Sequence, residues 1–320
     1  MAHTVEAAAA APSIHNSQPW QFAANGDELL LHGVPDRALS VSDPSARALY
    51  VSCGAALMNA RVALRASGLD PQIRLLPHPD YPFDVLAVIK ATQGTPPTAG
   101  ELNLYQSIWR RHTDRGPYSS RPIPRVVMAG LQKSAAAENA TLRKLSRGDT
   151  AVVLGLAARA SHELAADGDH RDELRRWLNS DAEDGIPDWA LPASPQSTPS
   201  PVRHVDFLAA SAAAGRPRAE YERHPQLAVL TTAADEPADW LTGGLALEHV
   251  LLVATLNGLS ASFLSQILER DDMLEAAHRS WPWPEHPQMI MRLGYGDGAM
   301  PTPRRSLDSV MHSADPLRIG

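Results

Sequence analysis

The sequence predicts an α+β fold made of two related halves within one chain. Helical and strand patterns alternate along all 320 residues. A long apolar helix predicted within residues 1–100 also has a counterpart of similar pattern near the C-terminus. A chain of this length exceeds one typical domain, so it can hold two hydrophobic cores.

Prolines and glycines mark the ends of the elements predicted in residues 1–100. Pro12 ends a first helix. Pro44, directly after Asp43, is a favourable start for a long second helix that stops at Gly68. Apolar runs rich in β-branched residues predict strands between the helices. The expected elements are the helix Thr4–Ala11, the strand Glu28–His32, the helix Asp43–Leu64 and the strand Val85–Ala91.

A Pro/Gly/Thr linker at residues 94–100 separates this series of elements from a second one. Apolar periodicity predicts further helices and strands beyond it. Residues 185–201 are rich in Pro and Ser and are a poor candidate for regular structure. The expected elements are the helices Leu102–Arg111, Val126–Ala137, Thr150–Ala166 and Leu241–Asn257 and the strands Pro225–Thr232 and Gln288–Gly294.

The two long helices align without a gap, which suggests an internal duplication. Gly54 aligns with Gly244, and the glycine that ends the first helix, Gly68, aligns with Gly258. Apolar matches alone carry little weight, because any two amphipathic helices share a period. The coincidence of both an internal and a terminal glycine is stronger evidence for a duplication. A duplication of this kind can imitate a two-fold homodimer within one chain.

Composition excludes several classes of function. With 36 acidic and 29 basic residues the net charge is -7, so there is no overall basic field for nucleic acid. The single cysteine, Cys53, excludes a disulfide framework and a Cys-based zinc site, and the histidines show no metal-ligand spacing. No apolar run reaches the ~20 residues that span a bilayer, and no signal peptide is recognisable, so we expect a cytoplasmic protein.

The stretch A-P-S-I-H-N-S-Q-P-W-Q-F, residues 11–22, is the most informative motif. Its two prolines fix the backbone, while Ser13, Asn16, Ser17 and Gln18 can supply a row of side-chain hydrogen bonds. A rigid polar loop beside a tryptophan suits a flat ring rich in heteroatoms. The alternative is a helix end followed by a loop anchored by its aromatic residue.

Two basic segments could each hold a phosphate. The run R-R-H-T-D-R, residues 110–115, combines three guanidinium groups with a hydroxyl, and arginine binds phosphate through bidentate, charge-assisted hydrogen bonds. The second segment, P-T-P-R-R, residues 301–305, follows a predicted strand and a glycine turn. The alternatives are a solvated basic helix end and a basic tail over a sheet edge.

The first motif resembles the A-P-S-x-x-N-x-Q-P-W signature of the nitroreductase-like flavoprotein superfamily. From about Val5 to Met311 the chain resembles the Acg-type branch of mycobacteria and other actinobacteria, which places two nitroreductase-like halves in one polypeptide. This resemblance implies mostly antiparallel central sheets flanked by helices. It also implies a first half at 1–100, a second half at 101–320, and a lid insertion at about 165–224.

The resemblance implies FMN as the cofactor. The loop residues would lie against its ring and ribityl chain, and an R-[RH]-S/T-x-[RK] segment and the basic tail would bind its phosphate. Near the flavin N5, family members have glycine or glutamate-glycine where this chain has Ser265 and Gln266. The implied cofactor-binding residues are Pro12, Ser13, Ile14, Asn16, Gln18, Arg111, His112, Thr113, Arg115, Ser265, Gln266, Arg304 and Arg305.

The two motifs occur once each, in different halves. We therefore expect one FMN per chain, between the halves, in a monomer or a homodimer. The implied activity is transfer of a hydride from NAD(P)H through the flavin to a nitroaromatic or quinone-like acceptor, without a catalytic carboxylate or histidine pair. One alternative is a protein that stores or sequesters FMN beneath its lid. The other is a flavin enzyme that acts on a biosynthetic intermediate.

Overall fold

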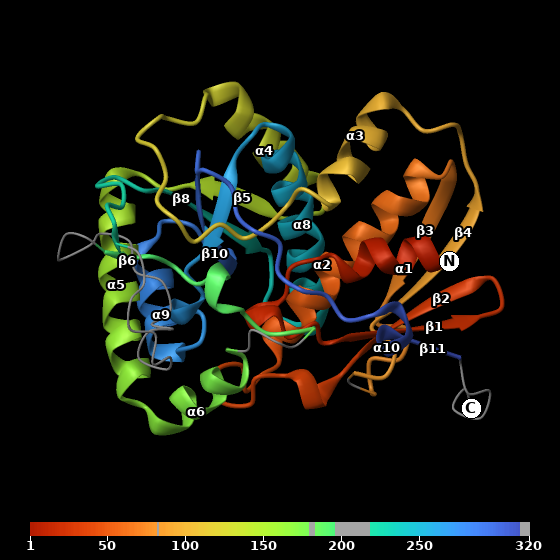
Figure 1. The fold of residues 1–320 in the computed structure, drawn as a ribbon, viewed down its shortest axis with the longest axis horizontal. Coiled ribbons are helices and arrows are strands. Elements are labelled where there is room, and N and C mark those ends of the chain that lie inside the picture. The colour runs from red at the N-terminus through yellow and green to blue at the C-terminus, as the bar shows by residue number, and fades with distance from the viewer. Residues whose placement is uncertain (82, 179–182, 196–217, 314–320) are drawn as a thin grey trace.

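The computed structural model describes residues 1–81, 83–178, 183–195 and 218–313. The fold is α+β. Two mostly antiparallel sheets lie on either side of a central pair of long helices, α2 (Arg47–Ala66) and α8 (Pro237–Leu256) (Figure 1). Each of these helices contacts the strands of the sheet in its own part of the chain.

The two sheets repeat one strand order. The first runs β11-β1-β2-β4-β3 and the second runs β5-β8-β10-β9. Every pairing in them is antiparallel except that of β11 with β1. The strands are β1 (Trp20–Asn25), β2 (Glu28–Gly33), β3 (Leu69–Leu75), β4 (Ala87–Gln93), β5 (Thr141–Lys144), β8 (Gln226–Thr232), β9 (Ser260–Phe263), β10 (His286–Gly294) and β11 (Met311–Ser313).

The remaining helices cover the outer surfaces. α1 packs on α2, and α4 packs on α8 in the corresponding way. No helix in the described part of the chain is long and apolar enough to cross a membrane. These helices are α1 (Ala2–Ala9), α3 (Ala99–Ile108), α4 (Arg125–Ala137), α5 (Arg147–Ala166), α6 (Gly168–Arg176), α9 (Asp271–Ser280) and α10 (Leu307–Val310).

The arrangement of elements supports the proposed duplication. The order β1-β2-β4-β3 in the first sheet corresponds strand for strand to β5-β8-β10-β9 in the second, with α2 and α8 at the same place in each series. The division of the chain at residue 100 does not separate the sheets, however. The short strand β11, near the C-terminus, pairs with β1, where Phe22 lies opposite Met311. The end of the second half thus completes the sheet of the first (Figure 1).

The two central helices cross in close contact at a pair of glycines. A Cβ atom on Gly54 would lie 2.2 Å from the carbonyl oxygen of Leu241, and one on Gly244 would lie 2.1 Å from that of Val51. These two contacts are equivalent under the alignment that pairs Gly54 with Gly244. Such reciprocity is the mark of a two-fold interface, here formed within one chain.

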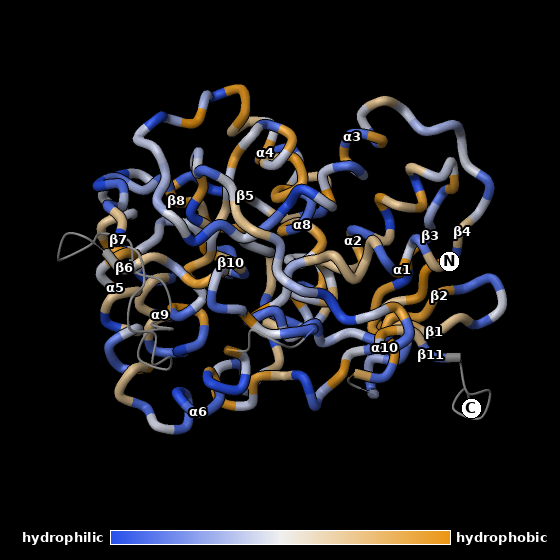
Figure 2. Tube along the Cα trace, viewed as in Figure 1, coloured by the Kyte–Doolittle hydropathy of each residue, from blue (hydrophilic) through white to orange (hydrophobic). Residues whose placement is uncertain are grey.

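Apolar residues fill a core on each side of this crossing, and a third core lies beneath α5 and α9. The first core includes Trp20, Phe22 and Leu57, and also the single cysteine, Cys53. The second core lies between α4, α8 and the second sheet. Apolar stretches follow the buried strands and the central helices, whereas α6 is hydrophilic along most of its length (Figure 2). Burial of this apolar surface is the main source of stability.

The predicted long helices and buried strands are confirmed, but several of their ends differ. The first helix ends at Ala9 and not at Ala11. The second begins at Arg47 and not at Asp43, because Ala46 takes a left-handed φ of 59°. The Asp43 carboxylate still caps this helix, since it accepts hydrogen bonds from the backbone N–H groups of Ala48 and Leu49.

Other differences have local causes. The helix predicted to end at Arg111 is α3, which begins after a capping box at Thr98 and ends at Ile108, so the arginine cluster lies beyond it. Within the segment predicted to lack regular structure, residues 194–195 form a two-residue strand, and residues 196–201 lie outside the described part. The short strands β1, β3, β5 and β9 and the helices α6 and α9 were not predicted.

Gly54→Ala should destabilise the fold by about 1–3 kcal/mol or more, because the new methyl group would overlap the backbone of α8. Gly130→Ala is the matched control. Gly130 lies within α4, where an added Cβ has no neighbour within 4 Å. The control should stabilise the helix by about 0.5–1 kcal/mol. Urea unfolding followed by circular dichroism measures both, and equal midpoints for the two variants would contradict the close crossing.

Candidate functional site

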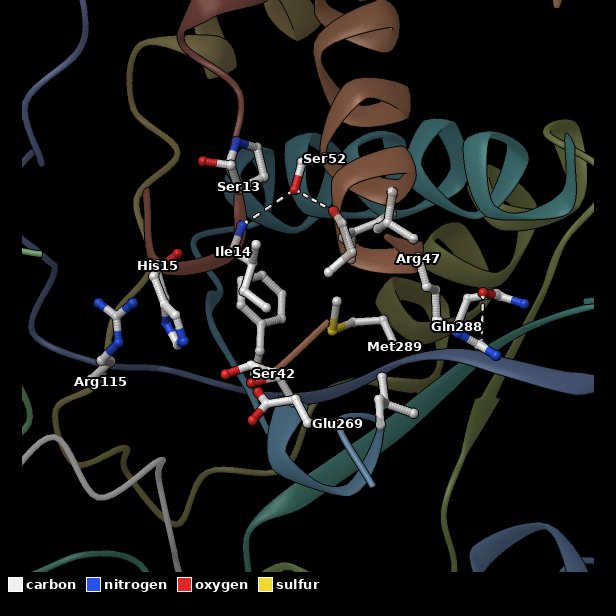
Figure 3. Close-up of a pocket in the computed structure, with 18 residues that line it drawn as sticks. Ser13, Ile14, His15, Ser42, Arg47, Ser52, Arg115, Glu269, Gln288 and Met289 are labelled. Carbon is white, nitrogen blue, oxygen red and sulfur yellow. Dashed lines mark hydrogen bonds between the residues drawn. The ribbon is translucent and has the colours of Figure 1, made fainter. Parts of the chain in front are cut away.

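A pocket opens between the two halves at the N-terminal end of α2 (Figure 3). It is formed by the loop after α1, the first turns of α2, one residue of α8, residues of β9 and β10, and the segments that carry Ser42, Thr113 and Glu269. Its walls are mainly apolar. The apolar lining residues are Pro12, Ile14, Ala48, Val51, Leu247, Phe263, Leu268 and Met289.

Ten polar or charged side chains also line the pocket. Arg115 and His15 lie at one end of the pocket, Arg47 and Gln288 lie at the other, and Glu269 lies between them (Figure 3). A concave apolar site with a few placed polar groups is the usual form of a small-molecule site. The hydroxyl groups that line it are those of Ser13, Ser42, Ser52, Thr113 and Ser265.

The loop after α1 is held in a tightly specified conformation. The backbone N–H of Gln18 donates to the Ser13 hydroxyl at 2.9 Å, and that of Ile14 donates to the Ser52 hydroxyl on α2 at 3.3 Å. His15, Asn16 and Gln18 all have positive φ, at 46°, 57° and 49°. Non-glycine residues in this region are strained, and such strain gathers at functional sites.

Asn16 and Gln18 hold neighbouring segments of the chain. The Asn16 amide donates to the carbonyl oxygens of Gly185 at 2.9 Å and Pro303 at 3.0 Å. The Gln18 amide donates to the carbonyl of Glu183 at 2.9 Å and accepts from the backbone N–H of Arg305 at 2.9 Å. Both side chains therefore fasten the insertion and the C-terminal tail to the loop, whereas Pro12, Ser13 and Ile14 line the pocket.

The arginine cluster divides between the pocket and the protein interior. Thr113 and Arg115 line the pocket. Burial lowers the pKa of Arg115 to about 10, and its guanidinium donates to the carbonyl of Ala190 at 3.1 Å. His112 lies beside Thr113 in a separate small cavity, where burial and the charge of Arg111 lower its pKa to about 4.

Arg111 lies in the interior and pairs with Glu248 of α8, with 3.3 Å between Nε and Oε1. Burial raises the pKa of Glu248 to about 7, an effect that Arg111 opposes. Arg111 also donates to the carbonyl of Ala10 at 3.3 Å, and Arg304 donates to the same oxygen at 3.1 Å. Two buried cations thus converge on the C-terminal end of α1, where the helix dipole favours positive charge.

The remaining predicted residues fix the tail and the segment after β9. Arg304 also donates to the Asn16 side-chain oxygen at 2.9 Å, and burial lowers its pKa to about 9. Arg305 donates to the carbonyl of Gln18 at 3.3 Å. Ser265 lines the pocket, while the buried Gln266 donates to the Ser161 hydroxyl at 3.3 Å. The structure therefore brings six predicted residues into the pocket: Pro12, Ser13, Ile14, Thr113, Arg115 and Ser265.

The described part of the insertion is docked beside the pocket. Glu173 of α6 accepts hydrogen bonds from the backbone N–H groups of Val41 and Ser42, both at 2.9 Å, and from the Ser42 hydroxyl at 2.7 Å. Asp184 forms an ion pair with Arg37, whose guanidinium lies over the Trp177 ring. The rest of the predicted lid, residues 179–182 and 196–217, lies outside the described part.

The sequence analysis missed a carboxylate–histidine pair at the pocket. Glu269 lines the pocket, and its Oε2 lies 3.7 Å from Nε2 of His170 on α6. Nothing in the pair itself assigns it a catalytic role, so the prediction that the reaction needs no catalytic carboxylate or histidine pair stays a prediction. The two residues share no motif and are far apart in the chain, so only the docking of α6 brings them together. Across the described residues, no group of three or more His, Cys, Asp or Glu side chains could hold a metal ion.

No protein-family model matches the chain. Curated relatives match almost all of it. "Putative NAD(P)H nitroreductase acg" of Mycobacterium tuberculosis is 30% identical over 314 residues, which cover 96% of this chain and 94% of the relative. "Putative NAD(P)H nitroreductase Rv3131" of the same organism is 31% identical over 315 residues, which cover 96% of this chain and 89% of the relative.

Solved structures match a smaller share of the chain. A nitroreductase with bound FMN from Bacteroides fragilis is 14% identical, with a TM-score of 0.39, over 68% of this chain and 97% of its own. A BluB-like flavoprotein from Clostridium difficile is 12% identical, with a TM-score of 0.43, over 66% of this chain and 99% of its own.

Arg111→Met should destabilise the fold by about 3–5 kcal/mol, because it leaves the Glu248 carboxylate buried without its cation. Adding Glu248→Gln should recover much of this loss, since the double variant no longer buries that unpaired carboxylate. Urea unfolding of the two variants and the parent chain measures both effects. An Arg111→Met chain as stable as its parent would contradict a structural role for Arg111.

Proposed function

The chain belongs to the nitroreductase-like flavoproteins of the Acg type, and on this premise we propose that its interdomain pocket binds FMN and serves an NAD(P)H-dependent oxidoreductase. The acceptor would be a nitroaromatic or quinone-like compound. One observation carries the proposal: the pocket is lined by Ile14, Thr113 and Ser265, from three separate segments that the sequence resemblance assigns to the flavin.

The chemistry of the pocket fits FMN. The side chains of Ile14 and Phe263 offer apolar surface for a flat ring, and the serine hydroxyls offer hydrogen bonds to its polar atoms. Arg115 and Thr113 would hold the phosphate, because a buried guanidinium forms strong charge-assisted hydrogen bonds with such an anion. Arg111, Arg304 and Arg305 hold other parts of the chain, so their predicted contact with the phosphate requires a rearrangement.

When bound, the flavin supplies the redox chemistry, and the protein supplies binding and orientation. The Ser13 and Ser52 hydroxyls hold the loop backbone in position against α2. The apolar side chains exclude water from the ring. The loop comes from the first half, whereas Thr113 and Arg115 come from the second, which supports one flavin site per chain.

A second function, tight holding of FMN without turnover, is favoured by the docked insertion. Hydrogen bonds from Asn16, Gln18 and Ser42 and the ion pair of Arg37 with Asp184 fasten the insertion beside the pocket. A lid held in this way would restrict the entry of both nicotinamide and acceptor. The two functions share the flavin site and differ in whether nicotinamide and acceptor can reach it.

Anaerobic titration of the FMN-loaded chain with NADPH tests both functions. The oxidoreductase should be yellow and should bleach as NADPH is added, since the flavin accepts a hydride. A yellow protein that stays oxidised would instead support sequestration. A colourless chain that cannot be reconstituted with FMN would contradict both proposals.

Asp184→Asn tests whether the insertion limits access. Loss of its ion pair with Arg37 should speed bleaching several-fold, because a partly exposed pair contributes up to about 1 kcal/mol. Asp172→Asn is the matched control, since Asp172 pairs with Arg175 on the exposed face of α6. Equal bleaching rates in the two variants would count against gating by the insertion.

A further inference from the structure

The Glu269 carboxylate is buried at the pocket, beside His170 of α6. Its side chain is 3% exposed, and neither of its oxygens has a hydrogen-bond partner among the described residues. It lines the pocket between the two ends that Arg115 and Arg47 occupy (Figure 3). His170 of α6 forms an ion pair with this carboxylate at 3.7 Å, which is longer than a hydrogen bond. A buried carboxylate is costly unless its oxygens accept hydrogen bonds, and the open pocket is where a donor can reach them.

Three titratable groups from different segments interact with Glu269: His170 on α6, His15 on the loop after α1, and Asp43 before α2. Arg115 and Glu173 lie beside His15, and Arg270 and Asp272 follow Glu269 in the chain and pair with each other. Of these, His170 forms an ion pair with Glu269 at 3.7 Å. This ion pair holds the Glu269 side chain against α6.

The titratable neighbours of Glu269 have shifted pKa values. Burial alone would lower the pKa of His170, but Glu269 outweighs it and raises the pKa above its ordinary value. Burial lowers the pKa of His15 to about 4, so His15 is neutral at pH 7. Burial, helped by Glu269, raises the pKa of Asp43 to about 7. His170 on the insertion therefore faces one side of the carboxylate, and the pocket faces the other.

We propose that Glu269 accepts a hydrogen bond from an N–H or ammonium group of the ligand bound in the pocket, and so selects ligands that carry such a donor. The inference rests on the proposed function, because it concerns the same pocket. An ionised carboxylate accepts hydrogen bonds and donates none, so it favours a donor and disfavours a carboxylate or phosphate at this position. Glu269 is thus a specificity-determining residue, and His170 is the residue that positions it.

The two arginines that line the pocket lie at its opposite ends (Figure 3). Arg47 is held by an ion pair with Asp235 and by hydrogen bonds to Gln288 and the Pro287 carbonyl. Arg115 lies at the far end, beside His15 (Figure 3). An anionic group of the ligand would lie near Arg115, and a donor group would lie near Glu269. The pocket therefore distinguishes the two ends of an elongated ligand by charge.

The donor has two sources, the imide N–H of the flavin ring or an amino group of the acceptor. The first arm of the test measures dissociation constants of FMN and N3-methyl-FMN for the apoprotein by flavin fluorescence. The second arm measures binding of 4-nitrobenzylamine, 4-nitrobenzyl alcohol and 4-nitrobenzoate by calorimetry, with and without FMN. Neither arm depends on turnover.

The parent chain should discriminate by about tenfold to a hundredfold in one of the arms, as expected for a hydrogen bond to a charged group. FMN would bind more tightly than N3-methyl-FMN if the flavin is the source. The amine would bind more tightly than the alcohol, and the benzoate least tightly, if the acceptor is the source. Glu269→Gln should reduce this discrimination, and Glu269→Leu should abolish it.

Glu275→Gln is the matched control, because Glu275 lies on α9 in an exposed pair with Arg279. It should leave every dissociation constant unchanged. Loss of discrimination in both Glu269 variants but not in this control supports the proposal. Equal affinities for all ligands in the parent chain would overturn it without any variant. A chain that fails to bind FMN at all would overturn the proposed function instead, and the calorimetric series on the apoprotein would still decide the role of Glu269.

Discussion

The close crossing of α2 and α8 at Gly54 and Gly244 is the constraint on which the rest of the structure depends. It joins two sheets of the same strand order into one body. The pocket lies at one end of this crossing, between the first turns of α2 and Leu247 of α8. The residue that aligns with Leu247, Leu57, is buried in the first core. The crossing therefore brings α2 and α8 together at the pocket, which residues of both helices line.

The strained loop after α1 depends on contacts from distant parts of the chain. Its Asn16 holds the insertion and the tail, and Arg304 of the tail shares the Ala10 carbonyl with Arg111. Positive φ angles at non-glycine residues persist only where surrounding structure over-determines them. The loop, the buried cations and the insertion therefore form one connected unit. A substitution in one of them would alter the conformation of the loop that lines the pocket.

The sequence could predict features that local patterns determine. Helix glycines and buried β-branched runs located α2, α8, β8 and most of β10, and the loop motif located Pro12, Ser13 and Ile14 at the pocket. It could not predict which side chains of a motif point away from the pocket. Arg111 pairs with Glu248, and Asn16 binds the Gly185 carbonyl of the insertion, and both partners lie far along the chain. The pairing of Glu269 with His170 depends wholly on tertiary packing. The strands β1, β3, β5 and β9 were not predicted because their pairing with neighbouring strands, more than their own composition, stabilises them.

We propose that the pocket between α2 and α8 is one flavin site, to which both parts of the chain contribute. Native mass spectrometry of the chain reconstituted with excess FMN tests this proposal, because it counts bound cofactor per polypeptide. We expect a single species with one FMN per chain, whether the chain is a monomer or a homodimer. Two FMN per chain would mean that each half holds its own flavin, and no bound FMN would mean that the pocket serves another ligand.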